Sequence, residues 1–264
     1  MPTLTVNNIN LYYEQHGEGP DLVLIGGLSS DHQVWKSTLR LFSKYFRVLI
    51  FDNRGAGRSD TPDYPYTTEM MANDTLQLMD ALEIQRAYVL GHSMGGRIAQ
   101  KMALIAPEKI NKCVIVCSPA KSSHLSSMIF SMREKLQHLG MNDEILAEYV
   151  MPFLFGEDFL KNQMLIKGFI QWTLQNEFPQ SAIGYKQQLH AVKNHDVLDQ
   201  LHQIEIPTLV IGGHEDILAP IASLEKLSKS LKNSTFVSIP HCAHMPHVEK
   251  SREFAEIVLK FLGV

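Results

Sequence analysis

The sequence predicts an α/β protein built on a doubly wound, mostly parallel β-sheet, with a helical insertion between two of its strands. Five apolar runs are continuous rather than alternating, which is typical of parallel strands that are covered on both faces. Segments with helical spacing lie between the runs, and such alternation produces right-handed crossovers in one sheet. The five continuous runs are residues 22–27, 47–52, 87–92, 112–117 and 208–213, and a sixth run, residues 11–15, is also expected to form a strand.

Helical patterns follow these strands in order. Apolar side chains recur at helical spacing over residues 35–46, 71–82 and 98–105, and again over residues 254–261 near the end of the chain. Pro107 lies just beyond the third of these segments, where a helix is expected to have ended. The elements therefore alternate along most of the chain.

One long segment, residues 119–205, breaks this alternation, because it contains helical patterns but no convincing strand. We therefore predict a core domain from residues 1–118 and 206–264 and a helical cap from residues 119–205. The segment is rich in Met and aromatic residues. Most should fill its own core, but some should face a ligand, since pockets are usually lined by apolar side chains. The candidates for substrate contact in this segment are Trp172, Met128 and Phe153.

The composition argues against several classes of protein. The chain of 264 residues has a formal net charge of −4 and no dense run of Lys or Arg, so neither nucleic acid nor a membrane surface is an expected partner. The apolar runs are far shorter than the ~20 residues of a membrane helix, and the first ten residues do not resemble a secretory signal. Three cysteines cannot form a disulfide framework, so a cytoplasmic location is expected.

The segment AYVLGHSMGGRIAQ, residues 87–100, runs from an expected strand through a glycine-rich turn into an expected helix. Its G-x-S-x-G pattern, formed by Gly91, Ser93 and Gly95, matches the nucleophile elbow, a sharp turn that exposes a serine hydroxyl above the sheet. The pattern lacks the glycine spacing of a dinucleotide loop and the lysine of a P-loop. A purely structural glycine-rich turn is the alternative.

A serine nucleophile needs a general base and a carboxylate that orients this base, and in an elbow fold they follow in the order serine, acid, histidine. Asp216 comes directly after the expected strand 208–213, with Glu215 as its rival. We expect the carboxylate to lie at the same edge of the sheet as Ser93, because the carboxyl ends of parallel strands meet there.

Three histidines, His241, His244 and His247, follow a strand-like run over residues 235–240. Their equal spacing resembles that of metal ligands, but Pro240 and Pro246 prevent a helix that would align them, and no group of carboxylates accompanies them. A single catalytic base is favoured over a metal site.

With Ser93, Asp216 and His244 in this order, the chain resembles the α/β-hydrolase superfamily, and most closely its small capped serine esterases, lactonases and C–C hydrolases. The matching stretches are LVLIGG, FDNRGAGRSD, VLGHSMGG, LVIGGHED and HCAHMPHVE, spread over nearly the whole chain. In this family a histidine is followed five residues later by glutamate, as His244 is followed by Glu249, and the aspartate spacing favours Asp216 over Glu215.

The resemblance implies an α/β-hydrolase fold with a cap after the sixth core strand and a catalytic triad of Ser93, Asp216 and His244. It implies no metal and no cofactor. The turn FDNRGAGRSD, residues 51–60, should shape a loop behind the site, although Arg54 could instead reach a substrate carboxylate.

Two backbone amides form the oxyanion hole in this family. One belongs to the residue after the nucleophile, which is Met94 here. The other follows a His-Gly pair, and because Gly26 and Gly27 stand there in this chain, Leu28 should be the donor. Gly27 is also a candidate for substrate contact. How the loop is held in place without the histidine side chain is left open by the sequence.

These features predict a serine hydrolase that cleaves a small to medium hydrophobic carboxylic ester or lactone through an acyl-enzyme. One alternative is a C–C bond hydrolase or enol-lactonase of aromatic breakdown with the same triad. Another is a non-enzymatic binder of a small ligand, since this fold hosts many functions. A serine at the elbow argues against dehalogenases and epoxide hydrolases, which have aspartate there. Whether the protein is a monomer or a homodimer is undetermined by the sequence.

Overall fold

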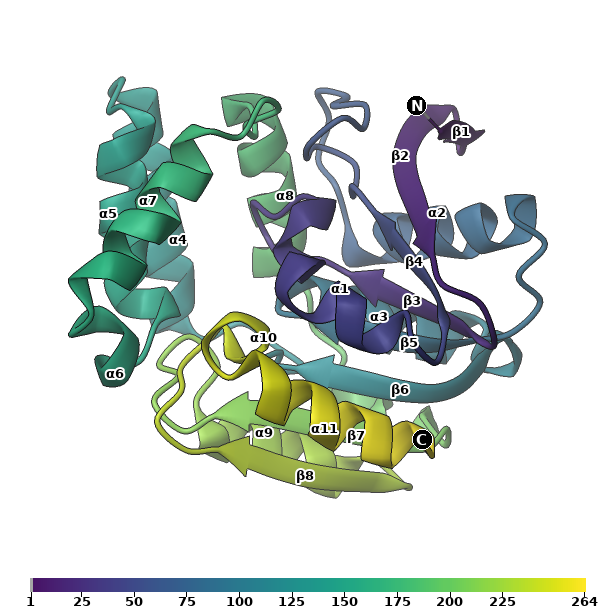
Figure 1. The fold of residues 1–264 in the computed structure, drawn as a ribbon. Coiled ribbons are helices and arrows are strands. Elements are labelled where there is room, and N and C mark those ends of the chain that lie inside the picture. Colours follow the sequence, from purple (N-terminus) through teal and green to yellow (C-terminus); the bar gives the residue numbers. More distant parts are fainter. Residues whose placement is uncertain (1) are drawn as a thin grey trace.

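The computed structural model describes residues 2–264, and an eight-stranded sheet forms its centre (Figure 1). The strand order is β1-β2-β4-β3-β5-β6-β7-β8; β1 and β2 pair in antiparallel fashion, and all strands from β4 to β8 run parallel. The strands are β1 (Thr3–Val6), β2 (Ile9–His16), β3 (Asp21–Ile25), β4 (Arg47–Phe51), β5 (Ala87–His92), β6 (Ile110–Val116), β7 (Thr208–Gly213) and β8 (Ser234–Ile239).

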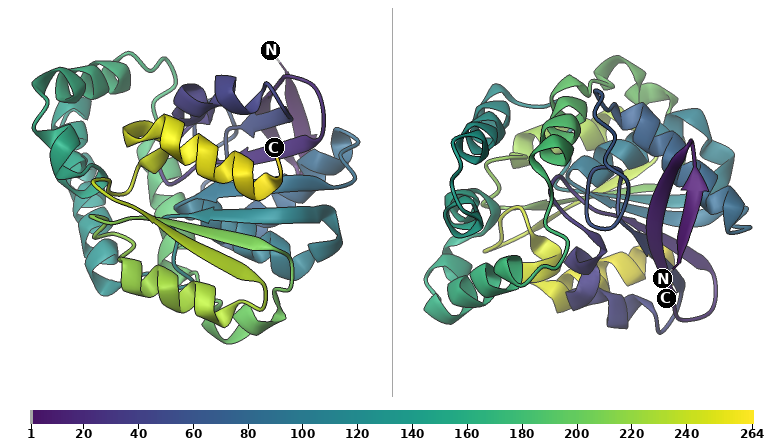
Figure 2. Two further views of the ribbon diagram at one scale, coloured as in Figure 1. Left: turned by 60° about the horizontal axis from the view of Figure 1, so that its bottom comes forward. Right: turned by 90° about the horizontal axis from the view of Figure 1, so that it is seen from above.

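Helices cover both faces of this sheet. Helices α1 and α11 pack together on one face, and α2, α3 and α9 lie on the other (Figure 2). Because both faces are covered, all residues of β7 and nearly all of β3 and β5 are buried, which explains their continuous apolar sequences. The helices of the core are α1 (Lys36–Phe42), α2 (Thr68–Ala81), α3 (Met94–Ile105), α9 (Ile221–Ser230), α10 (Pro246–Glu249) and α11 (Ser251–Leu262).

The predicted α/β fold with a mostly parallel sheet is confirmed, and each predicted strand corresponds to one of β2 to β7. The sequence analysis did not predict β1. The helix predicted over residues 35–46 is shorter, because α1 ends at Phe42. A turn follows it, in which the Phe46 amide donates to the Phe42 carbonyl at 3.1 Å. Phe46 is nevertheless buried, so its apolar side chain belongs to the core although it lies outside the helix.

The segment between β6 and β7 is helical and lies beyond the carboxyl ends of the parallel strands, whose arrows point toward it in Figure 1. We call residues 119–205 the helical insertion. Whether it is a separate cap domain with these boundaries stays a prediction. Its helices are α4 (His124–His138), α5 (Asp143–Leu154), α6 (Glu157–Leu160), α7 (Gln163–Leu174) and α8 (Ala182–Asn194), followed by a 3₁₀ helix (Leu198–Gln203).

The two ends of the helical insertion are joined to each other and to α3. Lys121 and Asp196 form an isolated β-bridge and an ion pair with 2.7 Å between Nζ and Oδ2. Arg97 of α3 reaches both ends, because its Nη1 donates to Ser122 Oγ at 2.5 Å and to the Val192 carbonyl. Burial lowers the pKa of Arg97 to about 10, so the guanidinium still carries its charge at neutral pH. The insertion is therefore anchored on the helix that follows Ser93.

A buried ion pair fixes the loop after β4. Arg54 Nε and Nη2 donate to the two carboxylate oxygens of Asp74 on α2, at 2.5 and 2.7 Å, and Nη1 donates to the Tyr64 hydroxyl at 3.0 Å. Both charged side chains are buried. Arg54 therefore holds the loop against α2, and the alternative that it reaches a substrate carboxylate is wrong. In residues 2–264, no helix combines the length and the hydropathy needed to cross a lipid bilayer.

This pair gives a test of the fold. Replacing Asp74 by alanine leaves the Arg54 guanidinium buried without its carboxylate, and breaking such a pair costs about 3–5 kcal/mol of unfolding free energy. Asp80 on the same helix provides the control, because its ion pair with Lys109 is exposed and its loss should cost at most about 1 kcal/mol. Denaturant unfolding of Asp74→Ala and Asp80→Ala measures both values. Equal, small losses would contradict this role of the pair.

Candidate active site

Ser93 lies in the tight turn between β5 and α3, at the carboxyl edge of the sheet. Its backbone φ is 54°, a left-handed value that is uncommon for a residue with a side chain. A Cβ on Gly95 would lie 2.0 Å from the Ile25 carbonyl oxygen, so only glycine allows α3 to start this close to β3. The local geometry has the features expected of the predicted elbow and directs the Ser93 hydroxyl away from the sheet.

His244 and Asp216 lie next to this hydroxyl. The distance from His244 Nε2 to Ser93 Oγ is 2.9 Å, and that from His244 Nδ1 to Asp216 Oδ2 is 2.8 Å. An aspartate carboxylate accepts hydrogen bonds, so Nδ1 carries the proton of the neutral ring and Nε2 is left as an acceptor for the serine hydroxyl. The structure thus brings together three residues that the sequence predicted as a group.

The carboxylate of Asp216 is held in place by the backbone that follows it. Its Oδ1 accepts the amides of Leu218 at 2.8 Å and Ala219 at 2.9 Å, while Oδ2 accepts from His244. The carboxylate is buried, and these hydrogen bonds involve both of its oxygens. Asp216 is therefore held in a fixed position next to the imidazole.

The rival residues lie elsewhere or have other contacts. Glu215 accepts the Glu157 amide of the helical insertion at 2.8 Å, and His241 is largely exposed. His247 is fully buried, and burial together with the neighbouring His244 lowers its pKa to about 3. A ring that stays neutral and does not contact Ser93 is a poor candidate for the base.

The loop that carries His244 is fixed by three contacts that the sequence analysis did not predict. Glu249 accepts the Ala243 amide at 2.9 Å and the Gly156 amide at 2.8 Å, and the His244 amide donates to Leu154 at 3.0 Å. Gly156 and Leu154 belong to the helical insertion. The spacing of His244 and Glu249 is visible in the sequence, but the hydrogen-bond partners of Glu249 could not be predicted from it.

His92, the residue before Ser93, also supports the site. Its Nε2 donates to the His244 carbonyl at 2.7 Å, and its ring lies 4.5 Å from that of His247. Burial, reinforced by the nearby His247 and His244, lowers the pKa of His92 well below its usual value. Both neighbouring rings therefore remain neutral, and His244 is the imidazole that contacts the Ser93 hydroxyl.

One group of side chains near the site could in principle bind a metal ion. Cys117 lies with Asp216 and His244 in a cluster whose possible ligand atoms are all within 4.8 Å of one another. Burial, with the charge of Asp216 next, raises the pKa of the Cys117 thiol well above its usual value, and a thiol is a weak metal ligand. The His244 and Asp216 atoms already bond each other, so the cluster fits an acid–base site better than a metal site.

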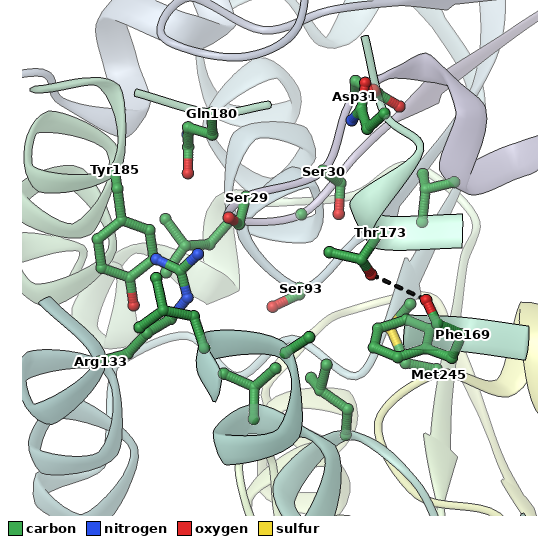
Figure 3. Close-up of a pocket in the computed structure, with 18 of the residues that line it drawn as sticks. Ser29, Ser30, Asp31, Ser93, Arg133, Phe169, Thr173, Gln180, Tyr185 and Met245 are labelled. Carbon is green, nitrogen blue, oxygen red and sulfur yellow. Dashed lines mark hydrogen bonds between the residues drawn. The ribbon is translucent and has the colours of Figure 1, made fainter. Parts of the chain in front are cut away.

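A cavity of about 170 Å³ opens above Ser93, between the core and the helical insertion (Figure 3). Its lining includes Ser93 and His244, and also Gly27, Leu28 and Trp172. That Gly27 and Trp172 contact a substrate stays a prediction. Met94 is fully buried and starts α3, so it offers a backbone amide rather than a side chain. The apolar residues of the remaining wall are Val34, Phe130, Leu146, Ala147, Val150, Leu154, Phe169, Pro179 and Met245.

Two predicted contact residues do not line this cavity. Met128 is 72% exposed on the outer side of α4, and Phe153 packs against Tyr149 with 5.5 Å between ring centroids. Phe130, two residues after Met128, lines the cavity instead. The prediction failed because apolar character alone does not tell which side of a helix faces inward.

Polar side chains in the cavity wall had no signal in the sequence. Arg133 and Tyr185 lie on one side of the cavity and Asp31 and Thr173 on the other, with Ser93 between them (Figure 3). The Arg133 guanidinium lies over the Tyr185 ring at 4.0 Å, and within residues 2–264 no carboxylate oxygen comes within 4.0 Å of it. The wall therefore includes one cation without an acidic partner.

Comparison with known proteins decides the family. A family model described as alpha/beta hydrolase fold matches residues 20–151 and 168–251, which is most of the chain. The chain belongs to the alpha/beta hydrolase family. The resemblance inferred from the motifs is thereby confirmed, and the sheet with its flanking helices is the fold of that family.

Relatives within the alpha/beta hydrolase family are similar to this chain over nearly its full length. It is 31% identical to a Caulobacter sp. (strain K31) protein provisionally named carbamate hydrolase RutD, with 96% of each chain covered. It is 28% identical to 3-oxoadipate enol-lactonase 2 of Acinetobacter baylyi, covering 97% of this chain and 94% of that one. The crystal structure of the enol-lactonase from Burkholderia xenovorans LB400 superimposes with a TM-score of 0.90 at 28% identity over all of both chains. The chain is therefore an enzyme of the hydrolase class.

The elbow gives a test of this geometry. Gly95→Ala places a Cβ against the Ile25 carbonyl, and we expect it to lower the unfolding free energy by about 3 kcal/mol or more, since overpacking against rigid backbone is costly. Gly168 of α7 is exposed with open space around its Cβ position, so Gly168→Ala should stabilise by about 0.5–1 kcal/mol. Thermal unfolding of both variants checks this. A Gly95→Ala protein as stable as the parent would contradict the close approach.

Proposed function

We propose that this hydrolase cleaves a small to medium hydrophobic carboxylic ester or lactone, with Ser93 as nucleophile, His244 as general base and Asp216 as the orienting acid. The observation that carries the proposal is the continuous chain of hydrogen bonds from Ser93 Oγ through His244 to Asp216, at 2.9 and 2.8 Å. A serine hydroxyl is a weak nucleophile unless such a base takes its proton.

The reaction proceeds in two steps. His244 Nε2 takes the Ser93 proton while Oγ bonds the acyl carbon, and the C–O bond to the alcohol breaks as His244 returns this proton to the leaving oxygen. Water then gives a proton to His244 and bonds the acyl carbon, and the acid is released as Ser93 regains its proton. In a lactone the leaving oxygen stays attached to the acyl group, so a single hydroxy acid is released.

Charge develops at two places during these steps. The carbonyl oxygen becomes an oxyanion, for which the backbone amides of Leu28 and Met94 are the proposed donors; Leu28 lines the cavity and Met94 starts α3. The imidazole of His244 becomes positive, and the buried Asp216 carboxylate stabilises it and keeps Nδ1 protonated. No cofactor takes part in this scheme.

The cavity supports the proposed size and polarity of the substrate. Its volume of about 170 Å³ suits a small acyl group, and its walls are mostly apolar. Five helices of the insertion lie beyond the strand ends, so residues 119–205 would act as a cap that separates the bound substrate from bulk solvent.

Loss of the nucleophile is the direct test. Ser93→Ala should lower kcat on p-nitrophenyl acetate or butyrate by about 10⁴–10⁶-fold, because triad members act as a unit. A fluorophosphonate probe should label the parent protein on the peptide that contains Ser93 and leave the variant unlabelled. Full esterase activity in Ser93→Ala would exclude the proposal, and an unlabelled, inactive parent protein would favour a non-enzymatic binder.

A second candidate, an enol-lactonase, is favoured by one observation. Arg133 puts a cation without an acidic partner in the cavity wall, and a guanidinium recognises a carboxylate by paired hydrogen bonds. Two of the relatives named above are enol-lactonases, and a lactone derived from a dicarboxylic acid keeps one free carboxylate. A substrate of this kind would place its lactone at Ser93 and its carboxylate at Arg133.

The choice between the two candidates can be measured with matched substrates. Arg133→Met keeps the unbranched stem of the side chain and removes its charge, so kcat/KM for a carboxylate-bearing lactone should fall about 10- to 100-fold, given about 1.5–3 kcal/mol for a charged hydrogen bond. The corresponding methyl ester of that lactone should be hydrolysed as fast as before. If both substrates lose the same factor, Arg133 does not select a carboxylate.

A further inference from the structure

The loop that offers the Leu28 amide begins with two glycines, and one turn within it is closed by the Ser30 amide, which donates to the Gly27 carbonyl at 3.2 Å. Its sequence is Gly26-Gly27-Leu28-Ser29-Ser30, and the glycines leave the backbone free to take many conformations. Ser29 has a φ of 67°, in the left-handed region, which costs energy for a residue with a Cβ. Something outside the loop must therefore hold this conformation.

The helical insertion supplies that contact. Gln188 of α8 is fully buried, and its side-chain Oε1 accepts the Ser29 amide at 3.2 Å. Its Nε2 donates to the Arg54 carbonyl at 2.8 Å, in the loop that the buried ion pair with Asp74 fixes. One side chain thus connects the loop after β3 to the rigid loop after β4.

A second glutamine fixes the orientation of the first. Gln180 Nε2 donates to Gln188 Oε1 and to the Gly55 carbonyl, both at 2.8 Å. If the Gln188 amide were rotated by half a turn, its NH₂ group would face the Ser29 and Gln180 donors and its oxygen would face the Arg54 carbonyl. Only the observed orientation satisfies all three partners, so the acceptor is held in a fixed position next to the Ser29 amide.

We propose that Gln188 is a positioning residue for the hydrolytic reaction, which holds the Leu28–Ser29 peptide so that the Leu28 amide points at the developing oxyanion. The inference rests on the proposed function, because it needs Ser93 to attack a carbonyl and the Leu28 amide to bind the resulting oxyanion. Gln188 does not touch the substrate, since it is absent from the lining of the cavity. It acts through the loop.

This role has a distinctive kinetic consequence. An oxyanion forms only in the transition state and the tetrahedral intermediate, so a displaced Leu28 amide lowers kcat while leaving the binding of the substrate nearly unchanged. A misplacement of about 1 Å can cost about 100-fold in rate. General damage to the fold would instead change KM, stability and kcat together.

The test compares two neighbouring glutamines of α8. Gln188→Leu removes the contact to Ser29, whereas Gln187→Leu removes a partly buried contact, from Nε2 to Asp63 Oδ1 at 2.9 Å, that lies away from the loop. With an aryl acetate as substrate, we expect Gln188→Leu to lower kcat about 10- to 100-fold with KM within about threefold of the parent value. Gln187→Leu should change kcat by less than about threefold, and thermal unfolding establishes that both variants are folded.

A second readout separates positioning from structural damage. A boronic acid forms a tetrahedral adduct on Ser93 with a negative oxygen in the oxyanion position, whereas the carboxylic acid product does not. Gln188→Leu should weaken boronic acid inhibition by about the factor lost in kcat and leave product inhibition unchanged. Should Gln188→Leu fail to fold, Gln188→Glu replaces it: the carboxylate still accepts the Ser29 amide but cannot donate to Arg54, so a smaller loss of kcat with the same unchanged KM is expected.

Two results would overturn this role: a Gln188→Leu protein with the parent kcat, or one in which kcat, KM and both inhibition constants change by the same factor. These results differ from a failure of the proposed function itself. If the parent protein does not react with a fluorophosphonate at Ser93, the hydrolytic mechanism is wrong. If the parent protein does react at Ser93 but the Gln188 variants keep the parent kcat, the mechanism stands and the positioning role is wrong.

Discussion

The site depends on one constraint: loops after three different strands must meet at the carboxyl edge of one sheet with hydrogen-bond accuracy. Ser93 follows β5, Asp216 follows β7 and His244 follows β8, and the imidazole contacts both of the others at under 3 Å. Each partner is fixed independently of the others. The strained elbow fixes the serine, two backbone amides fix the aspartate, and Glu249 fixes the loop of the histidine. In the proposed mechanism, this preorganisation would hold the serine hydroxyl and the imidazole together before the substrate binds.

The helical insertion lines the cavity and also makes hydrogen bonds that hold parts of the site in place. Its contacts reach the backbone of His244 through Leu154, the helix after Ser93 through Arg97 and the loop of Leu28 through Gln188. All three contacts end on backbone or buried polar groups, which fix position better than exposed side chains do. A shift of the insertion would therefore move the loop of His244, helix α3 and the loop of Leu28 together.

Much of this arrangement could be predicted from the sequence, for identifiable reasons. Buried parallel strands leave continuous apolar runs, and the residue types of a serine triad follow such runs in a fixed order, so Ser93, Asp216 and His244 could be grouped in advance. The strand β1 is short and at the sheet edge, and only Val6 of it is buried, so it left no pattern. Met128 and Phe153 were wrongly predicted to line the cavity, because which side of a helix faces inward depends on the elements that pack against it. Gln188 had no signal, since its partner Ser29 is 159 residues away in the chain.

The account is tested most directly by the coupling between His244 and Asp216. If the two residues act as one unit on Ser93, removal of the carboxylate can matter only while the imidazole is present. The measurement is kcat/KM on an aryl ester for the parent, His244→Ala, Asp216→Asn and the double variant. The double variant should be no slower than His244→Ala alone. If the two losses instead multiply, the residues act independently and the hydrogen-bonded triad is not the catalytic unit.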